Sequence, residues 1–133
     1  MYPCLPRVGC LVSDGLFRSQ NGRTGIEMPL EITVKELQKK QKSNERPVLL
    51  DVRESEEVAL VTLPNAIHIP MGEIPARLDE LDPASEIVVY CHHGVRSLQV
   101  VQFLRQNDYP HTVSLTGGID AWAVEVEQGL ARY

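Results

Sequence analysis

One cysteine lies where its thiol could become a nucleophile. Cys91 follows an apolar run over residues 87–90 (IVVY) and precedes a helical pattern, with a short loop between the two. The amides of such a loop and the N-terminus of the helix present positive potential, which favours thiolate over thiol. His92, His93 and Arg96 can add positive charge. Because thiolate is the nucleophilic form, Cys91 is predicted to attack or to carry a substrate atom.

The alternative for Cys91 is a plain role in packing, because a cysteine at a strand end is often a small buried apolar residue. Two features of the loop favour the nucleophile. Gly94 can adopt the positive φ that turns loop amides inward. Arg96 lies at a helix start, where its charge opposes the helix dipole and does not stabilise the helix. We therefore interpret Cys91 as a nucleophile held by this loop.

Three ordered motifs of the chain resemble those of one known family, the rhodanese sulfurtransferases. Residues 91–97 (CHHGVRS) and 98–106 (LQVVQFLRQ) resemble the active-site loop of the family and the helix that follows it. Residues 49–54 (LLDVRE) and 64–70 (PNAIHIP) resemble its upstream segments, and residues 115–122 (LTGGIDAW) are similar to its GGxxAW motif.

The resemblance, which runs from about residue 30 to about residue 130, implies sulfur transfer. The Cys91 thiolate would attack the outer sulfur of a donor such as thiosulfate, sulfite would leave, and a persulfide would remain until a thiol or protein acceptor takes the sulfur. Loop amides would stabilise the anionic persulfide as an oxyanion hole does. No metal or organic cofactor is required. The predicted substrate-binding residues are His92, His93, Gly94, Val95 and Arg96.

Two departures from the family pattern affect this interpretation. Val61, Thr62 and Leu63 replace the usual Gly-His-Ile-like triplet, which predicts altered packing beside the sheet. His92 and His93 stand where the best-known thiosulfate enzymes of the family have Arg and Lys. The sulfur donor therefore stays open.

Three charged residues could support the loop. Asp51 and Arg53 end a strand near the same sheet edge as Cys91, and we predict a buried ion pair that fixes the loop. For Arg96 two roles stay open, namely a charge-assisted contact with the donor's sulfonate and a structural pairing with a carboxylate. We favour donor binding, because Arg96 borders the loop that would hold the sulfonate.

Two other functions share this sequence pattern. Phosphatases of the same fold have five residues between the loop cysteine and arginine, whereas four separate Cys91 from Arg96. The shorter loop predicts a cradle sized for sulfur and too small for a tetrahedral phosphate. The second alternative is a sulfur-carrier or protein-interaction module that turns over little small donor.

Strand-like and helix-like segments alternate from residue 30 onward, which predicts a three-layer α/β fold with helices on both faces of a mostly parallel sheet. Ligands of such sheets bind at the carboxyl ends of the strands, where Cys91 falls. The predicted strands are residues 48–52, 66–69, 87–90 and 113–115. The predicted helices are residues 33–42, a turn at 55–57 and residues 120–128. Two further helices are predicted from apolar residues on one face. The first contains Ile74, Leu78 and Leu81, and the second buries Leu98, Val101 and Leu104.

The composition limits partners and compartment. A chain of 133 residues with 43% hydrophobic content can bury the core of one domain. A net charge of −5 argues against nucleic-acid or membrane-surface partners, and no apolar run is long enough to span a bilayer. Three cysteines without a secretory signal favour a reducing, cytoplasmic compartment.

The first 29 residues differ from the rest. Residues 1–29 hold four glycines and three prolines with little periodicity, which predicts an irregular arm before a domain over residues 30–133. Met28 directly precedes the first organised segment and is a candidate start. Cys4 and Cys10 are interpreted as exposed thiols, because no second Cys or His pair lies nearby to complete a metal site.

Overall fold

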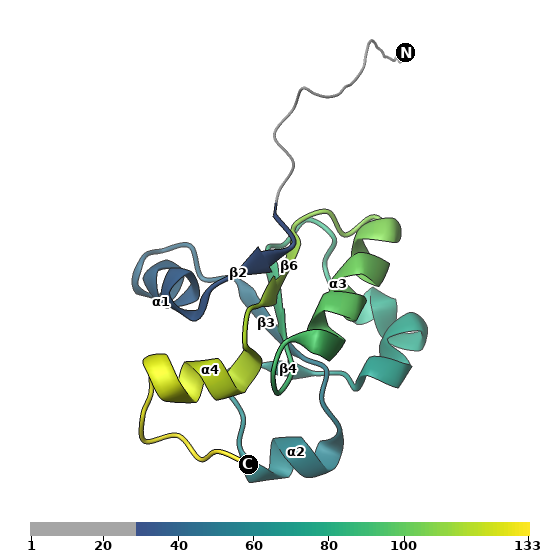
Figure 1. Cartoon of the computed structure of the whole chain (residues 1–133). Helices are drawn as coiled ribbons and strands as arrows, with labels where there is room; N and C mark the ends of the chain where they lie inside the picture. The colour runs from purple at the N-terminus through teal and green to yellow at the C-terminus, as the bar shows by residue number, and fades with distance from the viewer. Residues whose placement is uncertain (1–28) are drawn as a thin grey trace, which may run out of the picture.

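A five-stranded sheet is the centre of the protein, and the computed structural model describes residues 29–133 (Figure 1). The strand order is β2-β6-β5-β3-β4, and every neighbouring pair is parallel. The predicted α/β fold is therefore confirmed, with a sheet that is parallel throughout. The predicted arm over residues 1–29, with Cys4, Cys10 and Met28, lies outside the described residues except for Pro29.

The helices and strands alternate along the chain. In chain order the elements are β2 (Glu31–Ile32), α1 (Val34–Lys42), β3 (Val48–Asp51), α2 (Ser55–Leu60), β4 (Ile67–His68), the 3₁₀ helix η1 (Met71–Glu80), β5 (Ile87–Tyr90), α3 (Val95–Gln106), β6 (Thr112–Leu115) and α4 (Gly118–Glu125).

The sheet is covered on both faces, as its apolar strands predict. In β5, Ile87 and Val89 point into one cluster of buried side chains, while Val88 and Tyr90 point into the other. This alternation follows from the two-residue repeat of a strand. Figure 1 shows α1 and α4 on one face of the sheet and α3 with η1 on the other. Parallel strands buried in this way read as continuous apolar runs.

Two helices begin where their sequences place capping groups. In α1 the Glu36 N–H donates to Thr33 Oγ1 (3.1 Å), and the Thr33 N–H donates to Glu36 Oε1 (2.9 Å), which completes the predicted capping box. Helix α2 begins one residue after Glu54, whose N–H donates to Glu57 Oε2 (3.1 Å). This second cap matters for the site, because it orients the Glu57 carboxylate.

Three predicted details differ from the structure. The buried residues of α3 are Ser97, Val100, Val101 and Leu104, whereas Leu98 is only half-buried, because its side of the helix faces a groove beside β2. The segment after β4 is a 3₁₀ helix, which contains Pro75 and a non-helical Arg77. Helix α4 begins at Gly118 and ends at Glu125, so it starts two residues before the predicted 120–128 segment and ends three residues before its end.

The sheet topology fixes where a site can form. From β3 the chain moves outward to β4, and from β5 it moves in the opposite direction to β6. The carboxyl ends of β3 and β5 therefore flank a topological switch point, where parallel sheets leave room for a ligand. Cys91 directly follows β5 there. Among residues 29–133, no helix is both long and apolar enough to cross a membrane.

Candidate active site

The Cys91 thiol lies among hydrogen-bonding groups of the loop that follows β5. Cys91 is 1% exposed. Its Sγ accepts from the Gly94 N–H (3.0 Å) and the Ser97 N–H (3.4 Å), and the thiol donates to the Ser97 hydroxyl oxygen (3.5 Å). Gly94 has a φ of 106°, so the predicted left-handed glycine is present and turns the loop amides toward the sulfur. The loop thus holds one sulfur atom between two backbone donors and the Ser97 hydroxyl.

These donors decide the protonation of the thiol. Burial by itself would raise the pKa of Cys91, because it disfavours the charged form. Hydrogen bonds from the Ser97 hydroxyl and from the amides of Ser97, Gly94 and Arg96 outweigh burial, and the pKa lies below its ordinary value. These hydrogen bonds therefore make the thiolate of Cys91 more readily formed than that of an ordinary cysteine.

The Ser97 side chain is held in place by hydrogen bonds to strand β6 and to the loop. Its hydroxyl lies 2.7 Å from Ser114 Oγ on the neighbouring strand β6 and 3.2 Å from the Gly94 carbonyl oxygen. Both serines are fully buried. Buried hydroxyls with several partners keep one orientation, so this pair fixes the Ser97 hydroxyl beside the Cys91 sulfur.

A pair of glycines lets helix α4 approach the loop. The Ile119 N–H donates to the Cys91 carbonyl oxygen (2.9 Å), and the Asp120 N–H donates to that of His92 (3.1 Å). Gly117 and Gly118 before them have φ values of 77° and 62°. A Cβ on Gly118 would lie closer than 3.0 Å to both carbonyl oxygens. The motif over residues 115–122 therefore docks the N-terminus of α4 onto the Cys91 loop.

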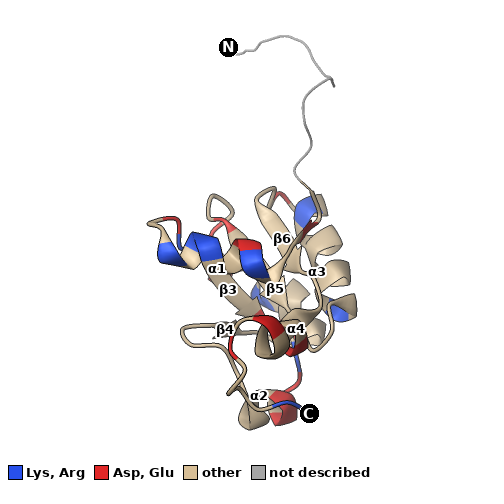
Figure 2. Cartoon of the chain, turned by 60° about the vertical axis from the view of Figure 1, so that its left-hand side comes forward, with Lys and Arg blue, Asp and Glu red and all other residues tan. Residues whose placement is uncertain are grey.

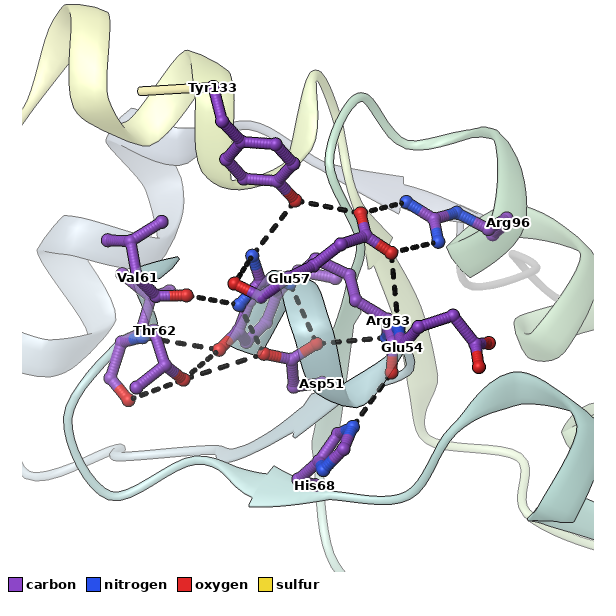
Figure 3. A network of polar contacts seen from close by, with 11 residues as sticks. Asp51, Arg53, Glu54, Glu57, Val61, Thr62, His68, Arg96 and Tyr133 are labelled. Carbon is purple, nitrogen blue, oxygen red and sulfur yellow. Dashed lines mark hydrogen bonds and ion pairs between the residues drawn. The ribbon is translucent and has the colours of Figure 1, made fainter. Parts of the chain in front are cut away.

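Asp51 and Arg53 form a buried ion pair below the loop (Figure 3). The Arg53 Nε and Nη2 groups donate to the two carboxylate oxygens at 2.9 and 2.6 Å, and both side chains are fully buried. Arg53 Nη2 also donates to the Val61 carbonyl (2.6 Å), and Nη1 donates to the Tyr133 hydroxyl (2.9 Å). Each buried charge thus has several partners, as low-dielectric surroundings demand.

Arg96 forms a bidentate ion pair with Glu57 of helix α2. Its Nη1 and Nη2 groups donate to the two carboxylate oxygens at 2.7 and 2.8 Å. The Tyr133 hydroxyl donates to the same carboxylate (2.9 Å), and Figure 3 shows it reaching Glu57 from the C-terminal segment. Chiefly through the Arg96 guanidinium, the pKa of Glu57 is lowered to about 2. Of the two alternatives for Arg96, the structure contains the pairing with a carboxylate.

The two loop histidines stack with Tyr133. The His92 ring lies 3.9 Å from the His93 ring on one side and 3.9 Å from the Tyr133 ring on the other. Burial lowers the pKa of His92, so its ring is neutral near pH 7. His92 Nε2 is buried and has no partner among the described residues. It is therefore a free hydrogen-bonding group beside the loop.

Three possible metal ligands lie beside the loop. One ligand atom from each of His92, His93 and Asp120 lies within 4.8 Å of the others. The two rings stack face to face, so their in-plane lone pairs do not converge. Asp120 is paired with Arg132 at 2.8 Å. As arranged, this group does not fit a metal ion, because such sites need converging ligands.

The motifs of this site are those of one protein family. The model of the rhodanese-like domain matches residues 33–125, which include the loop, the buried ion pair and the start of α4. This chain belongs to the rhodanese-like family.

Relatives of this rhodanese-like domain span most of its described length. A sulfurtransferase of Allochromatium vinosum is 37% identical over 93 residues, which cover 70% of this chain and 87% of that protein. A thiosulfate sulfurtransferase GlpE of Coxiella burnetii is 31% identical over 75 residues, 56% of this chain and 70% of that protein. The crystal structure of a rhodanese-like domain protein from Staphylococcus aureus has a TM-score of 0.69 and 34% identity, covering 79% of this chain and 99% of that one.

In this rhodanese-like domain the predicted site residues fall into two groups. Cys91, His92 and Gly94 lie together in the loop, while Val95 begins α3 with a 69% exposed side chain. His93 is also exposed. Asp51, Arg53 and Arg96 are joined to one another through Glu57 and Tyr133, as Figure 3 shows.

Four residues of the site were missed by sequence reasoning. Ser97 could have been found, because it lies in the first turn of the helix that follows Cys91. Glu57 and Tyr133 lie 39 and 37 residues from Arg96 along the chain, and no local pattern links them to the loop. Ser114 is one of two polar residues in the four-residue strand β6, a pattern that fits packing equally well.

Val61, Thr62 and Leu63 lie beside the sheet near the ion pair. The Thr62 hydroxyl lies 3.1 Å from the Tyr90 hydroxyl, which also accepts from the Leu63 N–H (3.2 Å). Burial raises the pKa of Tyr90 to about 12, so this hydroxyl stays protonated. The segment that departs from the family pattern therefore supplies hydrogen-bond partners to the buried Tyr90 hydroxyl at the end of β5.

Proposed function

We propose that this chain is a sulfurtransferase that moves a sulfane sulfur from a donor such as thiosulfate to a thiol or protein acceptor through a persulfide on Cys91. The observation that carries the proposal is the cradle of the Cys91 sulfur, formed by the Gly94 and Ser97 amides and the Ser97 hydroxyl. The relatives named for sulfur transfer, one of them for thiosulfate, support the reaction class.

The first step forms the persulfide. The Cys91 thiolate attacks the outer sulfur of thiosulfate, the sulfur–sulfur bond of the donor breaks, and sulfite leaves with the bonding electron pair. The product carries the negative charge on its outer sulfur. Because Gly94 and Ser97 donate to the inner sulfur position, they suit an anion held beside a helix N-terminus.

The second step returns the enzyme to its starting state. An acceptor thiolate attacks the outer sulfur of the persulfide, and the Cys91 thiolate leaves. No net oxidation occurs, and neither step requires a metal or an organic cofactor. The lowered pKa of Cys91 aids both steps, since the same thiolate is first the nucleophile and then the leaving group. A reducing compartment such as the cytoplasm suits a reaction that depends on free thiols.

The proposal is tested by sulfur transfer from thiosulfate to cyanide, measured as thiocyanate. Wild-type protein should turn over, and Cys91→Ser should not. A Cys4→Ser, Cys10→Ser variant is the matched control, because it loses two thiols and keeps Cys91. Turnover by Cys91→Ser at the wild-type rate would contradict the proposal. Negligible sulfur transfer together with rapid hydrolysis of a phosphate ester would instead identify a phosphatase.

A further inference from the structure

Both arginines that border the Cys91 loop are already neutralised by carboxylates. Arg96 is paired with Glu57 at 2.7 Å, and Arg132 is paired with Asp120 at 2.8 Å. Figure 2 shows acidic residues on α2 and α4, while a series of basic residues lies along α1. The whole chain has a net charge of −5. Within residues 29–133, the loop therefore offers an anionic donor its amide groups and two arginines whose charges are already compensated.

Glu57 is held firmly in this position. Besides the two hydrogen bonds from Arg96, its carboxylate accepts from the Glu54 N–H (3.1 Å) and from the Tyr133 hydroxyl (2.9 Å). Tyr133 in turn accepts from the buried Arg53. A carboxylate with four donors remains charged and does not readily swing away. To reach both Nη groups of Arg96, a sulfonate would have to displace this carboxylate.

The His92 ring is a polar group of the loop that is neutral near pH 7. His92 Nε2 is buried without a partner among the described residues, and its ring is fixed between His93 and Tyr133. A neutral imidazole can donate or accept one hydrogen bond. A donor in contact with it would gain one hydrogen bond and no attraction between opposite charges.

We infer that Glu57 is a specificity-determining residue whose charge disfavours doubly charged sulfane donors. This inference rests on the proposed function. The site is accordingly suited to donors with one charge or none, the class of persulfides and thiosulfonates of small organic groups. Thiosulfate, with two charges, is a usable but poor member of the donor range.

Two donors with the same reacting bond test this inference. Thiosulfate carries two negative charges and releases sulfite, whereas methanethiosulfonate carries one and releases methanesulfinate. Coulomb energy is proportional to the charge of the donor. Removing the Glu57 charge should therefore change the logarithm of kcat/KM twice as much for thiosulfate as for methanethiosulfonate. In Glu57→Gln we expect kcat/KM to rise about tenfold for thiosulfate, mainly through KM, and about threefold for methanethiosulfonate.

A matched control removes the same charge one residue away. Glu56 lies on the exposed side of α2, and Glu56→Gln should change both values less than about twofold, as expected for an exposed and screened charge. Equal changes for the two donors in Glu57→Gln, or a fall for thiosulfate alone, would overturn the inference.

A second pair of variants separates repulsion from the release of Arg96 and covers a failure of Glu57→Gln to fold. In an Arg96→Gln background no guanidinium remains to be freed, yet adding Glu57→Gln should still raise the ratio of thiosulfate to methanethiosulfonate activity. An unchanged ratio in that background would contradict a charge effect of Glu57. Failure of the proposed function looks different, because wild-type protein would then transfer sulfur from neither donor.

Discussion

Replacing Gly118 with alanine should displace helix α4 from the Cys91 loop, although Gly118 has no side chain in the site. The new Cβ would lie closer than 3.0 Å to the carbonyl oxygens of Cys91 and His92, and Gly118 has a φ of 62°. Real Cβ atoms do not tolerate such distances, so α4 must move away from the loop. That movement breaks the hydrogen bonds that Ile119 and Asp120 donate to the same two carbonyls.

The magnitude follows from these two effects. A left-handed conformation costs a non-glycine residue about 1–2 kcal/mol, and each of the two hydrogen bonds contributes about 0.5–1.5 kcal/mol. The free energy of unfolding should therefore fall by about 2–5 kcal/mol. Sulfur transfer should fall as well, because the amides around the Cys91 sulfur move with the loop.

Urea unfolding and thiosulfate turnover measure the two effects. Gly72→Ala is the matched control, because no atom lies within 4 Å of the position of its Cβ. It should leave activity unchanged and unfold at the wild-type urea concentration or slightly above it. If Gly118→Ala were as stable and as active as Gly72→Ala, the docking of α4 onto the loop would not matter as argued.

Three further predictions concern single contacts. In Ser97→Ala the pKa of Cys91 should rise, because the hydrogen bond with the Ser97 side chain lowers it, and the pH dependence of thiol alkylation would show the change. Arg53→Met should lower the free energy of unfolding by about 3–5 kcal/mol, because it leaves the buried Asp51 carboxylate without its ion-pair partner. Lys40→Met, at a half-exposed ion pair, should lower it by about 1 kcal/mol or less. Equal losses in the two variants would contradict the reasoning. The pKa of Glu57 falls on folding from 4.5 to about 2, so its contribution to stability is present above pH 4.5 and lost as the pH falls toward 2. The free energy of unfolding, measured in urea across that pH range, should therefore fall less steeply with decreasing pH in Glu57→Gln than in the wild type. An identical fall in both proteins would contradict the lowered pKa.

The sequence predicted the parts of the site that depend on local patterns. The run over residues 87–90 is apolar throughout, so β5 was predicted with its observed bounds, and Cys91 with it. Gly94 was predicted from a backbone requirement that few residues meet, and α1 from a capping box.

The contacts between distant segments could not be predicted in this way. The Arg96 side chain could have met any of several carboxylates, and the choice of Glu57 depends on how α2 packs near the loop. Tyr133 joins Arg53 and Glu57 across 80 and 76 residues of sequence. The helix pattern erred at Leu98 because a groove, invisible in the sequence, lies beside that side of α3.

The central claim is that Cys91 holds the transferred sulfur, and intact-mass measurement after incubation with thiosulfate tests it most directly. Wild-type protein should gain one sulfur atom, and digestion should place it on the peptide that contains Cys91. Cys91→Ser should gain none, while the Cys4→Ser, Cys10→Ser variant should gain as much as wild type. A wild-type protein that gains no sulfur, or a Cys91→Ser variant that gains it equally, would contradict the claim.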